Sequence, residues 1–362
     1  MKIGVPKEVK NNEYRVGLTP KSVLELMKYD HEIFVESNAG SAIGFSDLDY
    51  KNAGAKIVNS AEEVYELSSL IVKVKEPIPE EFKFLNKSHT VFAYLHLAGD
   101  PQNGMELTST GITGIALETV TADDGSMPLL SPMSAIAGQL SIIVGSYHLL
   151  KPNNGMGTLI GSFQDIKPRT VTVIGAGVAG TEAIKKAIDN RANLKIIDLS
   201  IDKLNHLKTI FGEDNIEYIL SSESSINSAI AESDLVVGAV YVIGKQAPKV
   251  IKNSMLKNMK QGAVMVDISI DQGGCFESSM PTTHDNPTYI KDNIVHYCVT
   301  NMPGAVPLTA TEALNKATLP YVMELANKGV DTALNENPHL AMGLNIKNGE
   351  VVHEAVREAL VS

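Results

Sequence analysis

Residues 170–180 read TVTVIGAGVAG, and this stretch decides the fold of the region that contains it. A short run of β-branched residues, typical of a buried strand, leads into Gly175, Gly177 and Gly180. In a strand–turn–helix unit the first glycine permits the tight turn, the second lets the backbone approach a pyrophosphate, and the third allows close helix packing. Val178 opens the following helix, whose free N–H groups and positive dipole end attract phosphate. The spacing therefore predicts a dinucleotide-binding turn.

The next predicted strand ends in an acid, Asp198. It lies close to the spacing of about 20 residues at which a carboxylate binds the adenosine ribose diol. A carboxylate there repels a 2′-phosphate, so the pattern favours NAD over NADP. Lys203, five residues on, either softens that preference or contacts the ribose or adenine edge. A glycine turn in an α/β domain without a nucleotide is the competing interpretation, and the combination of strand, glycines, helix and acid disfavours it.

Short apolar runs alternate with amphipathic segments along the whole chain, which is typical of parallel α/β architecture. Strands are expected at residues 2–5, 32–36, 70–75, 90–98, 112–120, 170–174, 194–198, 235–240, 263–268 and 294–299. Helices are expected at 19–28, at 60–67, in a long apolar segment that ends near 150, and at 178–190, 202–211, 308–328 and 350–361. Thr19 with Pro20 predicts an N-cap for the first helix, and Ser60 with Glu63 predicts a capping box for the second.

A chain of 362 residues predicts two domains at roughly 150 residues each. Turn-forming residues at 121–134 indicate one boundary, and the segment NMPG at 301–304 indicates another. The expected fold is a Rossmann dinucleotide-binding domain at residues 129–306 plus a second α/β domain of flavodoxin or Rossmann type. That second, substrate-binding and catalytic domain is expected to be discontinuous, with residues 307–362 returning to pack on residues 1–128.

Composition excludes several classes of function. The net charge of −11 argues against broad binding of nucleic acid or anionic membranes, since both need clustered positive charge. Polar residues interrupt the most apolar stretch, residues 135–150, before it reaches the ~20 residues that span a bilayer. The two cysteines have no Cys-x-x-Cys spacing, so no metal site is expected. The charged opening segment lacks the apolar core of an export signal, and a cytoplasmic enzyme is the expectation.

Seven further segments resemble those of the alanine dehydrogenase family, which also includes the alpha subunit of proton-translocating nicotinamide nucleotide transhydrogenase. They are GVPKE (4–8), EYRVGLTP (13–20), VKVKEP (72–77), YLHLA (94–98), SPMSAIAGQ (131–139), VDISIDQGGCFE (266–277) and TNMPGAVP (300–307). The resemblance implies NAD-dependent, reversible oxidative deamination of L-alanine to pyruvate and ammonium, in a homohexamer.

The same resemblance implies further nucleotide contacts, carried over by position. These are Ser134, Val178, Ser221, Val240, Tyr241, Ile268, Ser269, Ile270, Asp271, Val299, Thr300, Asn301 and Met302. Ser222 adjoins Ser221 and competes with it for that position. Met280 stands where some relatives carry an arginine near the cofactor, so a weaker contact is expected there.

Two basic residues are candidates for binding the substrate. Arg15 suits a substrate carboxylate because guanidinium binds carboxylate through a two-pronged fork, while a surface arginine is the alternative. Lys73 and Lys75 are two apart at the end of a predicted strand and face the same side of it, either as a solvated edge pair or as ligands. The resemblance selects Lys75, which would hold the substrate carboxylate or the 2-oxo oxygen of pyruvate.

His96 and Asp271 are the catalytic candidates. A histidine in a buried run is often a satisfied core residue, but its usual pKa of about 6.5 suits acid–base catalysis, and the resemblance assigns His96 that role. Asp271 follows a predicted strand, whereas Asp267 lies within it, and loops at strand ends open onto the ligand crevice. Asp271 would orient the attacking water, and a turn-forming aspartate is the alternative.

Two other hypotheses compete with a dehydrogenase. One is a nucleotide-binding subunit related to the proton-translocating transhydrogenase, which predicts a membrane partner. The other is a non-catalytic NAD(H)-binding protein, which would keep Asp198 and the glycines but lose Arg15, Lys75 or His96. All three of those residues are present, so the dehydrogenase is favoured.

Overall fold

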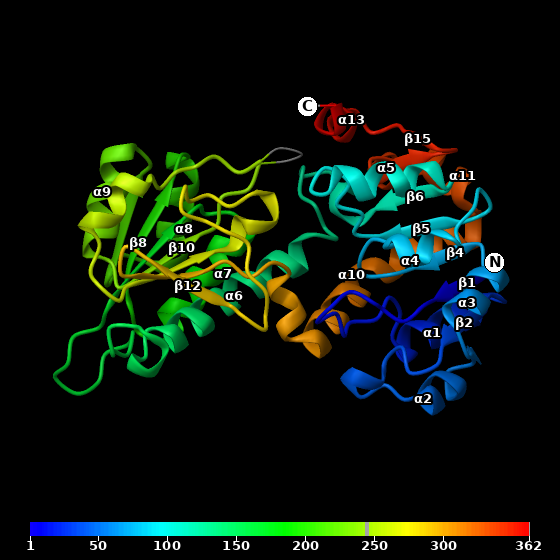
Figure 1. The fold of residues 1–362 in the computed structure, drawn as a ribbon, viewed down its shortest axis with the longest axis horizontal. Coiled ribbons are helices and arrows are strands. Elements are labelled where there is room, and N and C mark those ends of the chain that lie inside the picture. The colour runs from blue at the N-terminus through cyan, green and yellow to red at the C-terminus, as the bar shows by residue number, and fades with distance from the viewer. Residues whose placement is uncertain (243–245, 362) are drawn as a thin grey trace. The chain divides into compact units, whose positions relative to one another are not determined.

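A computed structural model describes residues 1–242 and 246–361 and divides the chain into two compact units. Unit 1 consists of Met1–Met133 and Gly304–Ser362, and unit 2 of Ser134–Pro303. The sequence put the divisions at 128/129 and 306/307. Both units are α/β (Figure 1).

Unit 1 is built on an eight-stranded sheet. Its strands are β1 (Lys2–Val5), β2 (Glu32–Glu36), β3 (Lys56–Val58), β4 (Leu70–Val72), β5 (Thr90–Ala93), β6 (Thr113–Ala116), β14 (Leu344–Lys347) and β15 (Glu350–Val351). Their order is β15-β14-β6-β5-β4-β1-β2-β3, in which β1 to β6 are parallel and β14 is antiparallel to both of its neighbours. Consecutive parallel strands require crossover connections, and helices supply most of them.

The helices of unit 1 come from both ends of the chain. They are α1 (Pro20–Leu26), α2 (Asp47–Asn52), α3 (Ala61–Leu67), α4 (Pro79–Phe82), α5 (Pro101–Ser109), α10 (Pro307–Lys328), α11 (Val330–Glu336), α12 (Pro338–Ala341) and α13 (Glu354–Val361), with 3₁₀ turns η1 (Met27–Tyr29), η2 (Ser41–Ile43) and η3 (Leu117–Thr119). The C-terminal segment, orange to red in Figure 1, returns to the N-terminal strands through the pairing of β14 with β6.

The helix starts follow the expected chemistry with one difference. The Thr19 hydroxyl accepts the Ser22 N–H at 3.1 Å, and Pro20 occupies the first turn as predicted. The Ser60 hydroxyl accepts the Glu63 N–H at 3.3 Å, but the Glu63 carboxylate accepts the N–H of Asn59 instead of Ser60. The capping box predicted at α3 is therefore wrong in its reciprocal half, because Asn59 offers its own N–H to the same carboxylate.

Unit 2 has a seven-stranded sheet, formed by β7 (Thr170–Ile174), β8 (Asn193–Asp198), β9 (Ile216–Leu220), β10 (Leu235–Gly238), β11 (Val264–Asp267), β12 (Thr288–Lys291) and β13 (Ile294–Tyr297). Six parallel strands take the order β9-β8-β7-β10-β11-β13, and β12 pairs antiparallel with β13. This is the doubly wound order of Rossmann domains, which confirms the predicted fold class.

The helices and turns of unit 2 are α7 (Val178–Asp189), α8 (Ile201–Phe211), α9 (Glu223–Glu232), η4 (Lys151–Asn153), η5 (Asn253–Asn258) and η6 (Ile268–Gln272). Most of α6 (Ser131–His148) also belongs to unit 2, and η7 (Met302–Ala305) contains the second boundary between the units. The core of the unit combines buried side chains of β10 and β11 with Phe276 and Met255. No helix within the described residues of the chain is long and apolar enough to cross a membrane.

Three strands of unit 1 end earlier than the sequence predicted: β4 at Val72, β5 at Ala93 and β6 at Ala116. Beyond two of these ends a carboxylate replaces the neighbouring strand as hydrogen-bond acceptor. The N–H of Val74 donates to Glu8 at 2.7 Å, and that of His96 donates to Glu118 at 2.7 Å. Lys75 and His96 consequently lie in loops just past the sheet, not at strand termini as expected.

Candidate active site

The glycine turn of unit 2 is required by the backbone around it. Gly175 has φ of +99°, and a Cβ there would lie 2.4 Å from the carbonyl oxygen of Ala239. A Cβ on Gly180 would lie 1.8 Å from the carbonyl oxygen of Gly175. A Cβ on Gly177, in contrast, would meet nothing within 4 Å. The first and third glycines are therefore required by the packing of the protein itself. The second borders open space, so a ligand can approach the backbone there closely.

Helix α7 begins immediately after this turn. Gly177 is its N-cap residue and makes no side-chain cap, so the N–H groups of the first turn have no capping oxygen from that residue. Val178, the first helical residue, is exposed. A helix N-terminus of this kind is suited to an anionic phosphate, because its N–H groups and dipole both favour negative charge.

Asp198 lies at the end of β8 against the glycine turn. One carboxylate oxygen accepts the N–H of Ala176 at 2.7 Å, and the other accepts the N–H of Ser200 at 2.8 Å. Each carboxylate oxygen has a further lone pair, so this carboxylate can also accept from two ribose hydroxyls. Lys203 stands on the first turn of α8 with an exposed side chain.

The turn sits where the strand order of the sheet reverses. β7 and β10 are neighbours, so the loop after β7 lies beside Val240 and Tyr241, which follow β10. The Ser269 hydroxyl in η6 donates to the carbonyl of Val240 at 2.7 Å. Ligands of doubly wound sheets bind at such a reversal point, outside the carboxyl ends of the strands.

Asp267 and Asp271 have different environments. Asp267 is fully buried and accepts the N–H groups of Ser269 at 2.9 Å and Cys275 at 2.8 Å, so it fixes the loop that follows β11. Asp271 is exposed in η6. The buried residue is structural, whereas Asp271 is accessible to a ligand.

The other nucleotide contacts implied by the resemblance differ in burial and in the hydrogen bonds that they already make. The backbone N–H of Ser221 donates to the carbonyl of Asp198 at 2.9 Å, whereas the Ser222 hydroxyl caps α9 by accepting from Ser225 at 3.1 Å. Ser222 is thus engaged within its own helix. Val299 and Met302 are buried, so any ligand contact there would involve the backbone.

In unit 1, Arg15 is buried and tied to its neighbour Glu13. Its side chain donates from Nε at 2.7 Å and from Nη2 at 2.5 Å to the two oxygens of Glu13, and Nη1 lies 3.2 Å from the sulfur of Met133. Burial alone would lower the pKa of Arg15, but the Glu13 carboxylate raises it. The guanidinium is therefore held in one orientation by a side-on, charge-assisted pair. Glu13 was not predicted as a functional residue.

Lys73 and Lys75 serve different purposes. Lys73 is 1% exposed, and its Nζ lies 2.7 Å from Glu81 and 3.5 Å from Glu8. Burial lowers and the two carboxylates raise the pKa of Lys73, with a net increase. Of the two interpretations of the lysine pair, the solvated one does not hold for Lys73, because its charge is neutralised inside the protein. Lys75 is partly exposed.

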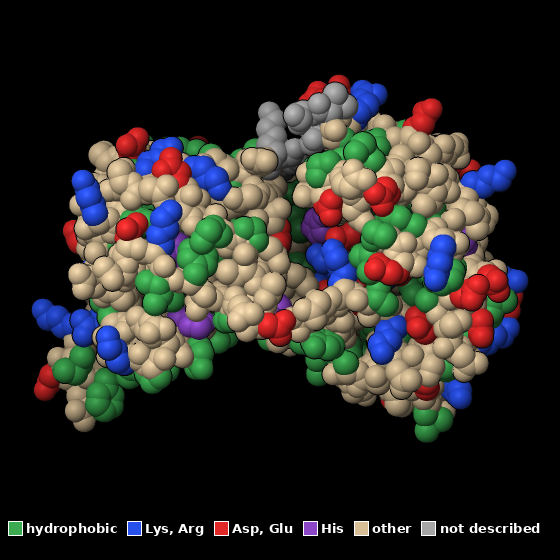
Figure 2. Space-filling model, viewed as in Figure 1, with side chains coloured by type: hydrophobic (Ala, Val, Ile, Leu, Met, Phe, Trp, Pro, Cys, Tyr) green, Lys and Arg blue, Asp and Glu red, His purple; other side chains and the backbone are tan. Residues whose placement is uncertain are grey.

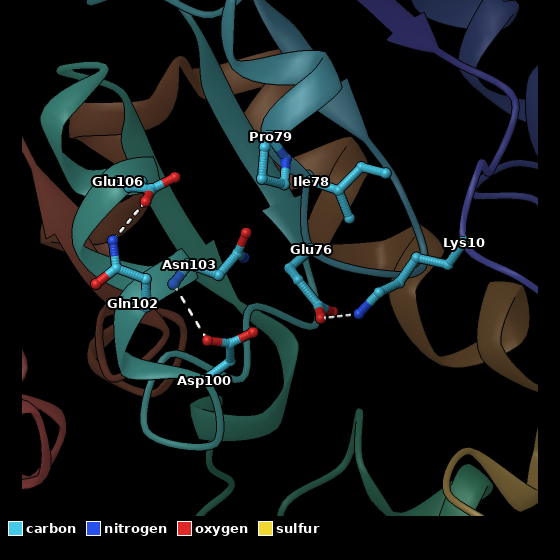
Figure 3. Close-up of a pocket in the computed structure, with 8 residues that line it drawn as sticks. All are labelled: Lys10, Glu76, Ile78, Pro79, Asp100, Gln102, Asn103 and Glu106. Atoms are coloured by element: carbon cyan, nitrogen blue, oxygen red, sulfur yellow. Dashed lines mark hydrogen bonds and ion pairs between the residues drawn. The ribbon is translucent and has the colours of Figure 1, made fainter. Parts of the chain in front are cut away.

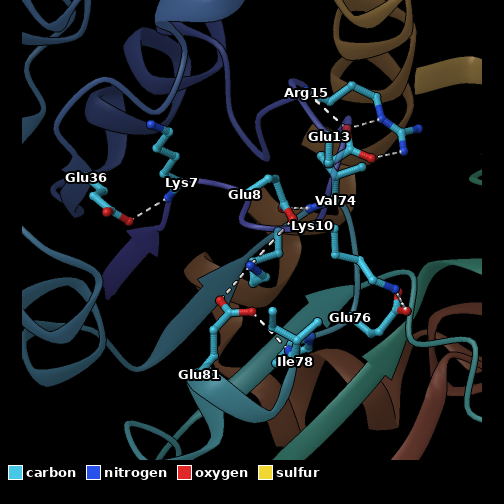
Figure 4. Close-up of polar contacts among 12 residues, drawn as sticks. Lys7, Glu8, Lys10, Glu13, Arg15, Glu36, Val74, Glu76, Ile78 and Glu81 are labelled. Carbon is cyan, nitrogen blue, oxygen red and sulfur yellow. Dashed lines mark hydrogen bonds and ion pairs between the residues drawn. The ribbon is translucent and has the colours of Figure 1, made fainter. Parts of the chain in front are cut away.

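Glu8 joins these groups into one network, drawn in Figure 4. Its Oε1 accepts the N–H of Val74, while Oε1 of Glu81 accepts from both the Tyr65 hydroxyl, at 2.9 Å, and the Lys73 ammonium group. Burial raises the pKa of Glu8 to about 7 despite the opposing charge of Lys73. The network has more carboxylates than cations, so a proton on Glu8 relieves the excess negative charge.

His96 has an unusual backbone conformation. Its φ is +46°, in the left-handed region, and its ring stacks on Tyr94 with centroids 5.8 Å apart. The N–H groups of Leu95 and His96 both donate to Glu118, at 3.2 and 2.7 Å. A non-glycine residue adopts this conformation only when its surroundings hold it, and here the Glu118 carboxylate does so.

Glu118 was missed by the sequence analysis. It lies in η3 directly after β6, and its only sequence signal is an acid at the end of a predicted strand. Burial, with a smaller contribution from the charge of Glu76, raises the pKa of Glu118 to about 7 despite the backbone N–H groups that it accepts. Its contacts make it a positioning residue for the His96 loop.

The candidate residues of unit 1 share one edge of its sheet. β1, β4, β5 and β6 are consecutive parallel neighbours. Arg15, Lys75, His96 and Glu118 follow these four strands in that order. The carboxyl ends of parallel strands meet at one edge, so these four residues gather at that edge. Within the described residues, no group of three His, Cys, Asp or Glu side chains is arranged to hold a metal ion.

Comparison with known proteins gives matches over nearly the whole chain. The family description "Alanine dehydrogenase/PNT, N-terminal domain" matches residues 4–137, and "Alanine dehydrogenase/PNT, C-terminal domain" matches residues 141–354. An alanine dehydrogenase of Mycolicibacterium smegmatis is 47% identical over 99% of this chain and 97% of its own length. An alanine dehydrogenase of Halomonas elongata is 46% identical over 99% and 96%.

Solved structures agree with these sequence matches. A structure titled L-alanine dehydrogenase has a TM-score of 0.95 and 46% identity, covering 100% of this chain and 99% of that one. A transhydrogenase from Sinorhizobium meliloti has a TM-score of 0.82 over 98% of this chain and 100% of its own, at 21% identity. That second likeness shows a shared fold alone.

Proposed function

The chain belongs to the alanine dehydrogenase/PNT family, and from this premise we propose that it catalyses the reversible, NAD-dependent oxidative deamination of L-alanine. The reaction converts L-alanine, water and NAD to pyruvate, ammonium, NADH and a proton. The observation that carries the proposal is the succession of Arg15, Lys75 and His96 after three neighbouring parallel strands. This edge offers two cations for a carboxylate and an acid–base group beside them.

NAD is the cofactor that the residues of unit 2 fit. The open space at Gly177, the uncapped start of α7 and the carboxylate of Asp198 together suit a pyrophosphate and an adenosine ribose. The other proposed contacts are Ser134, Gly175, Val178, Gly180, Lys203, Ser221, Val240, Tyr241, Ile268 to Asp271 and Val299 to Met302. When bound, NAD supplies the hydride acceptor.

Side chains of the protein bind the substrate, transfer a proton and orient the attacking water. Arg15 binds the substrate carboxylate, and Glu13 keeps the guanidinium in place. Lys75 holds the carboxylate or, in the reverse direction, polarises the 2-oxo oxygen of pyruvate. His96 accepts a proton during oxidation and returns it during reductive amination. Asp271 orients the water that attacks the imine carbon of the oxidised substrate.

The direct test is L-alanine-dependent formation of NADH by the pure protein at alkaline pH. We expect turnover with L-alanine and NAD, and the reverse reaction with pyruvate, ammonium and NADH. The matched control is His96→Gln, which removes the acid–base group while leaving the nucleotide turn intact, so NADH binding should persist without turnover. A wild-type protein that binds NADH but produces none from L-alanine would overturn the proposal.

We also propose that the enzyme is a homo-oligomer, with a hexamer suggested by the family resemblance. Unit 2 exposes several large apolar side chains on α6 and the loop that follows it: Ile143, Tyr147, Leu159, Phe163 and Ile166. Figure 2 shows hydrophobic side chains gathered over this projecting end of the unit. An exposed apolar patch of this kind is typical of a protein interface. Light scattering of wild type and Phe163→Asp tests this, and an unchanged mass would remove the patch from the interface.

We propose that the enzyme is cytoplasmic. Both cysteines, Cys275 and Cys298, are buried free thiols, which is the state that a reducing compartment maintains. Fractionation of cells that express the full chain tests the location, and activity found outside the soluble fraction would contradict it.

A further inference from the structure

The short turn η6, which carries Asp271, lies beside the segment that follows β10. Strands β10 and β11 are parallel neighbours, so the chain that leaves each of them emerges at the same edge of the sheet. Ser269 near the start of η6 connects the two segments through its hydroxyl, which donates to the carbonyl of Val240. A second and more extensive connection lies at the end of η6, at Gln272.

The side-chain amide of Gln272 binds both polar groups of one backbone residue, Val242. Its Nε2 donates to the Val242 carbonyl at 3.0 Å, and its Oε1 accepts the Val242 N–H at 3.4 Å. An amide carries a donor and an acceptor side by side, so it matches the N–H and the carbonyl of one residue. The carbonyl of Gln272 itself accepts the N–H of Ala247 at 3.0 Å. Gln272 therefore ties η6 to the chain on the neighbouring strand's side.

Other contacts fix the internal fold of this loop. The buried carboxylate of Asp267 accepts the N–H groups of Ser269 at 2.9 Å and Cys275 at 2.8 Å, near the two ends of the loop. Those bonds connect the loop to its own strand, β11, which ends at Asp267. The Gln272 side chain instead connects the loop to the segment after β10. Loss of that side chain should therefore shift η6 without unfolding the loop.

Unit 1 connects the two loops that carry Lys75 and His96 in a similar way. Asn103 lies on α5, where the Asp100 side chain accepts its backbone N–H at 3.2 Å (Figure 3). The Asn103 side-chain amide donates to the carbonyl of Pro77, two residues after Lys75, at 3.3 Å. Helix α5 follows the His96 loop, so this amide ties together the segments after β4 and β5. In both units an amide side chain connects the segments that follow two neighbouring parallel strands.

We propose that Gln272 is a positioning residue for Asp271 and holds it in the place that the deamination reaction requires. The inference rests on the proposed function, in which Asp271 orients the water that attacks the imine carbon. Asp271 is exposed, and the η6 backbone determines where its carboxylate lies. The amide of Gln272 is engaged with Val242, so Gln272 acts through its neighbour Asp271 and not on the substrate. A displacement of about 1 Å at a reacting group can lower a rate by on the order of 100-fold.

The first test is a double-mutant cycle on turnover. Gln272→Met keeps the length of the side chain and removes both of its hydrogen bonds to Val242. It should lower kcat for alanine oxidation by about 10-fold and leave the alanine KM within about twofold, because Arg15 and Lys75 are untouched. In an Asp271→Ala background the same substitution should lower kcat by less than about twofold, since no carboxylate is left to position.

Several results of this cycle would overturn the proposal. A loss of about 10-fold in both backgrounds would show that Gln272 acts independently of Asp271. Wild-type kcat in Gln272→Met would show that the tie to Val242 is dispensable, and wild-type kcat in Asp271→Ala would leave no catalytic carboxylate to position. Gln272→Glu keeps the shape of the side chain and, when ionised, loses only the donor to the Val242 carbonyl, so it should also lower kcat and gives a second test with a less disruptive change.

Hydrogen exchange of the full chain, followed by mass spectrometry, tests the tie without relying on activity. Gln272→Met should speed exchange in the peptides that contain η6 and Val242, and unchanged exchange there would overturn the proposal. The matched control is Gln261→Met, an exposed glutamine in the turn before β11, which should change neither kcat nor exchange. If wild type oxidises alanine normally while the Gln272 results are negative, only this inference fails. A wild type that forms no NADH from L-alanine would overturn the proposed function itself, and the role of Gln272 with it.

Discussion

The two units of this chain use the same strand order for different chemistry. Each unit has six parallel strands, and the order of the strands in the sheet reverses between the first and the fourth of them, β1 and β4 in unit 1 and β7 and β10 in unit 2. At the reversal point of unit 2 the protein presents backbone: glycines, helix N–H groups and a single carboxylate. At that of unit 1 it presents charged side chains, several of them buried.

This difference teaches that topology determines where a ligand binds, while the loops determine what is bound. A pyrophosphate needs close approach to backbone, which side chains would obstruct. A small carboxylate needs a fixed guanidinium, which requires compensating carboxylates such as Glu13. The following substitutions test this difference between backbone recognition in unit 2 and side-chain recognition in unit 1, from the largest expected effect to the smallest.

Gly180→Ala should have the largest effect. Its Cβ would lie 1.8 Å from the Gly175 carbonyl, so helix α7 must move away from β7. We expect a loss of about 3 kcal/mol or more of stability and loss of NADH binding, measured by chemical denaturation and by fluorescence titration. Gly177→Ala is the matched control, because its Cβ meets nothing within 4 Å. It should fold like wild type but bind NADH more weakly, and unchanged binding would show that the turn does not contact the cofactor.

Arg15→Lys tests whether unit 1 binds the substrate carboxylate through a charged side chain. A lysine ammonium cannot reproduce the fork, and Glu13 loses one of its two charge-assisted bonds. We expect the alanine and pyruvate KM values to rise by about 10- to 100-fold, as measured by steady-state kinetics. Arg169→Lys, an exposed arginine in unit 2, is the control and should leave both constants unchanged. Wild-type constants in Arg15→Lys would remove Arg15 from the substrate site.

Asp198→Ala tests the carboxylate beside the glycine turn of unit 2. Loss of the carboxylate removes the repulsion of a 2′-phosphate, so the preference for NAD over NADP should narrow by about tenfold. The ratio of kcat/KM values for the two cofactors measures the effect. Asp202→Ala in the first turn of α8 is the control. An unchanged ratio would argue against a ribose contact by Asp198.

Glu8 is not among the proposed ligand contacts, so Glu8→Gln should have the smallest effect on activity, and its effect should appear in the pH dependence of stability. The folded-state pKa of Glu8 is raised from 4.5 to about 7 by burial. The folded state therefore holds the proton more tightly, and this stabilisation is present below pH 4.5 and lost as the pH rises through about 7. The Gln variant should lose this dependence, by on the order of 1–3 kcal/mol between pH 4.5 and 7.5. Urea denaturation at both pH values measures it, with Glu66→Gln, an exposed glutamate on α3, as the control. An unchanged slope in Glu8→Gln would assign the dependence to other groups.

Much of the architecture was predictable because local signals determine it. Strands β2 and β7 lie where the apolar runs predicted them, and the glycine turn with Asp198 has the local geometry that its spacing indicates. Several elements were missed, including β3, β9, α2, α5 and α9. β3 has three residues and α2 has six, and segments this short carry little periodicity.

Other features depended on long-range contacts. Sequence spacing treated Lys73 and Lys75 alike, and only the arrival of Glu8 and Glu81 made Lys73 a buried ion-pair residue. His96 was expected at a strand end, but Glu118, 22 residues later, takes its backbone N–H and holds it in a left-handed turn. The burial that raises the pKa of Glu8 and Glu118 depends on several packed elements and has no sequence signature.

The sequence by itself determined the fold class, the dinucleotide turn and the family, because these depend on local propensity and on residues close together in the chain. Only the tertiary structure decided which charges are buried and which carboxylates hold the candidate catalytic residues. The physical reason is that desolvation and electrostatic pairing depend on distance in space, and strands far apart in sequence bring these groups together.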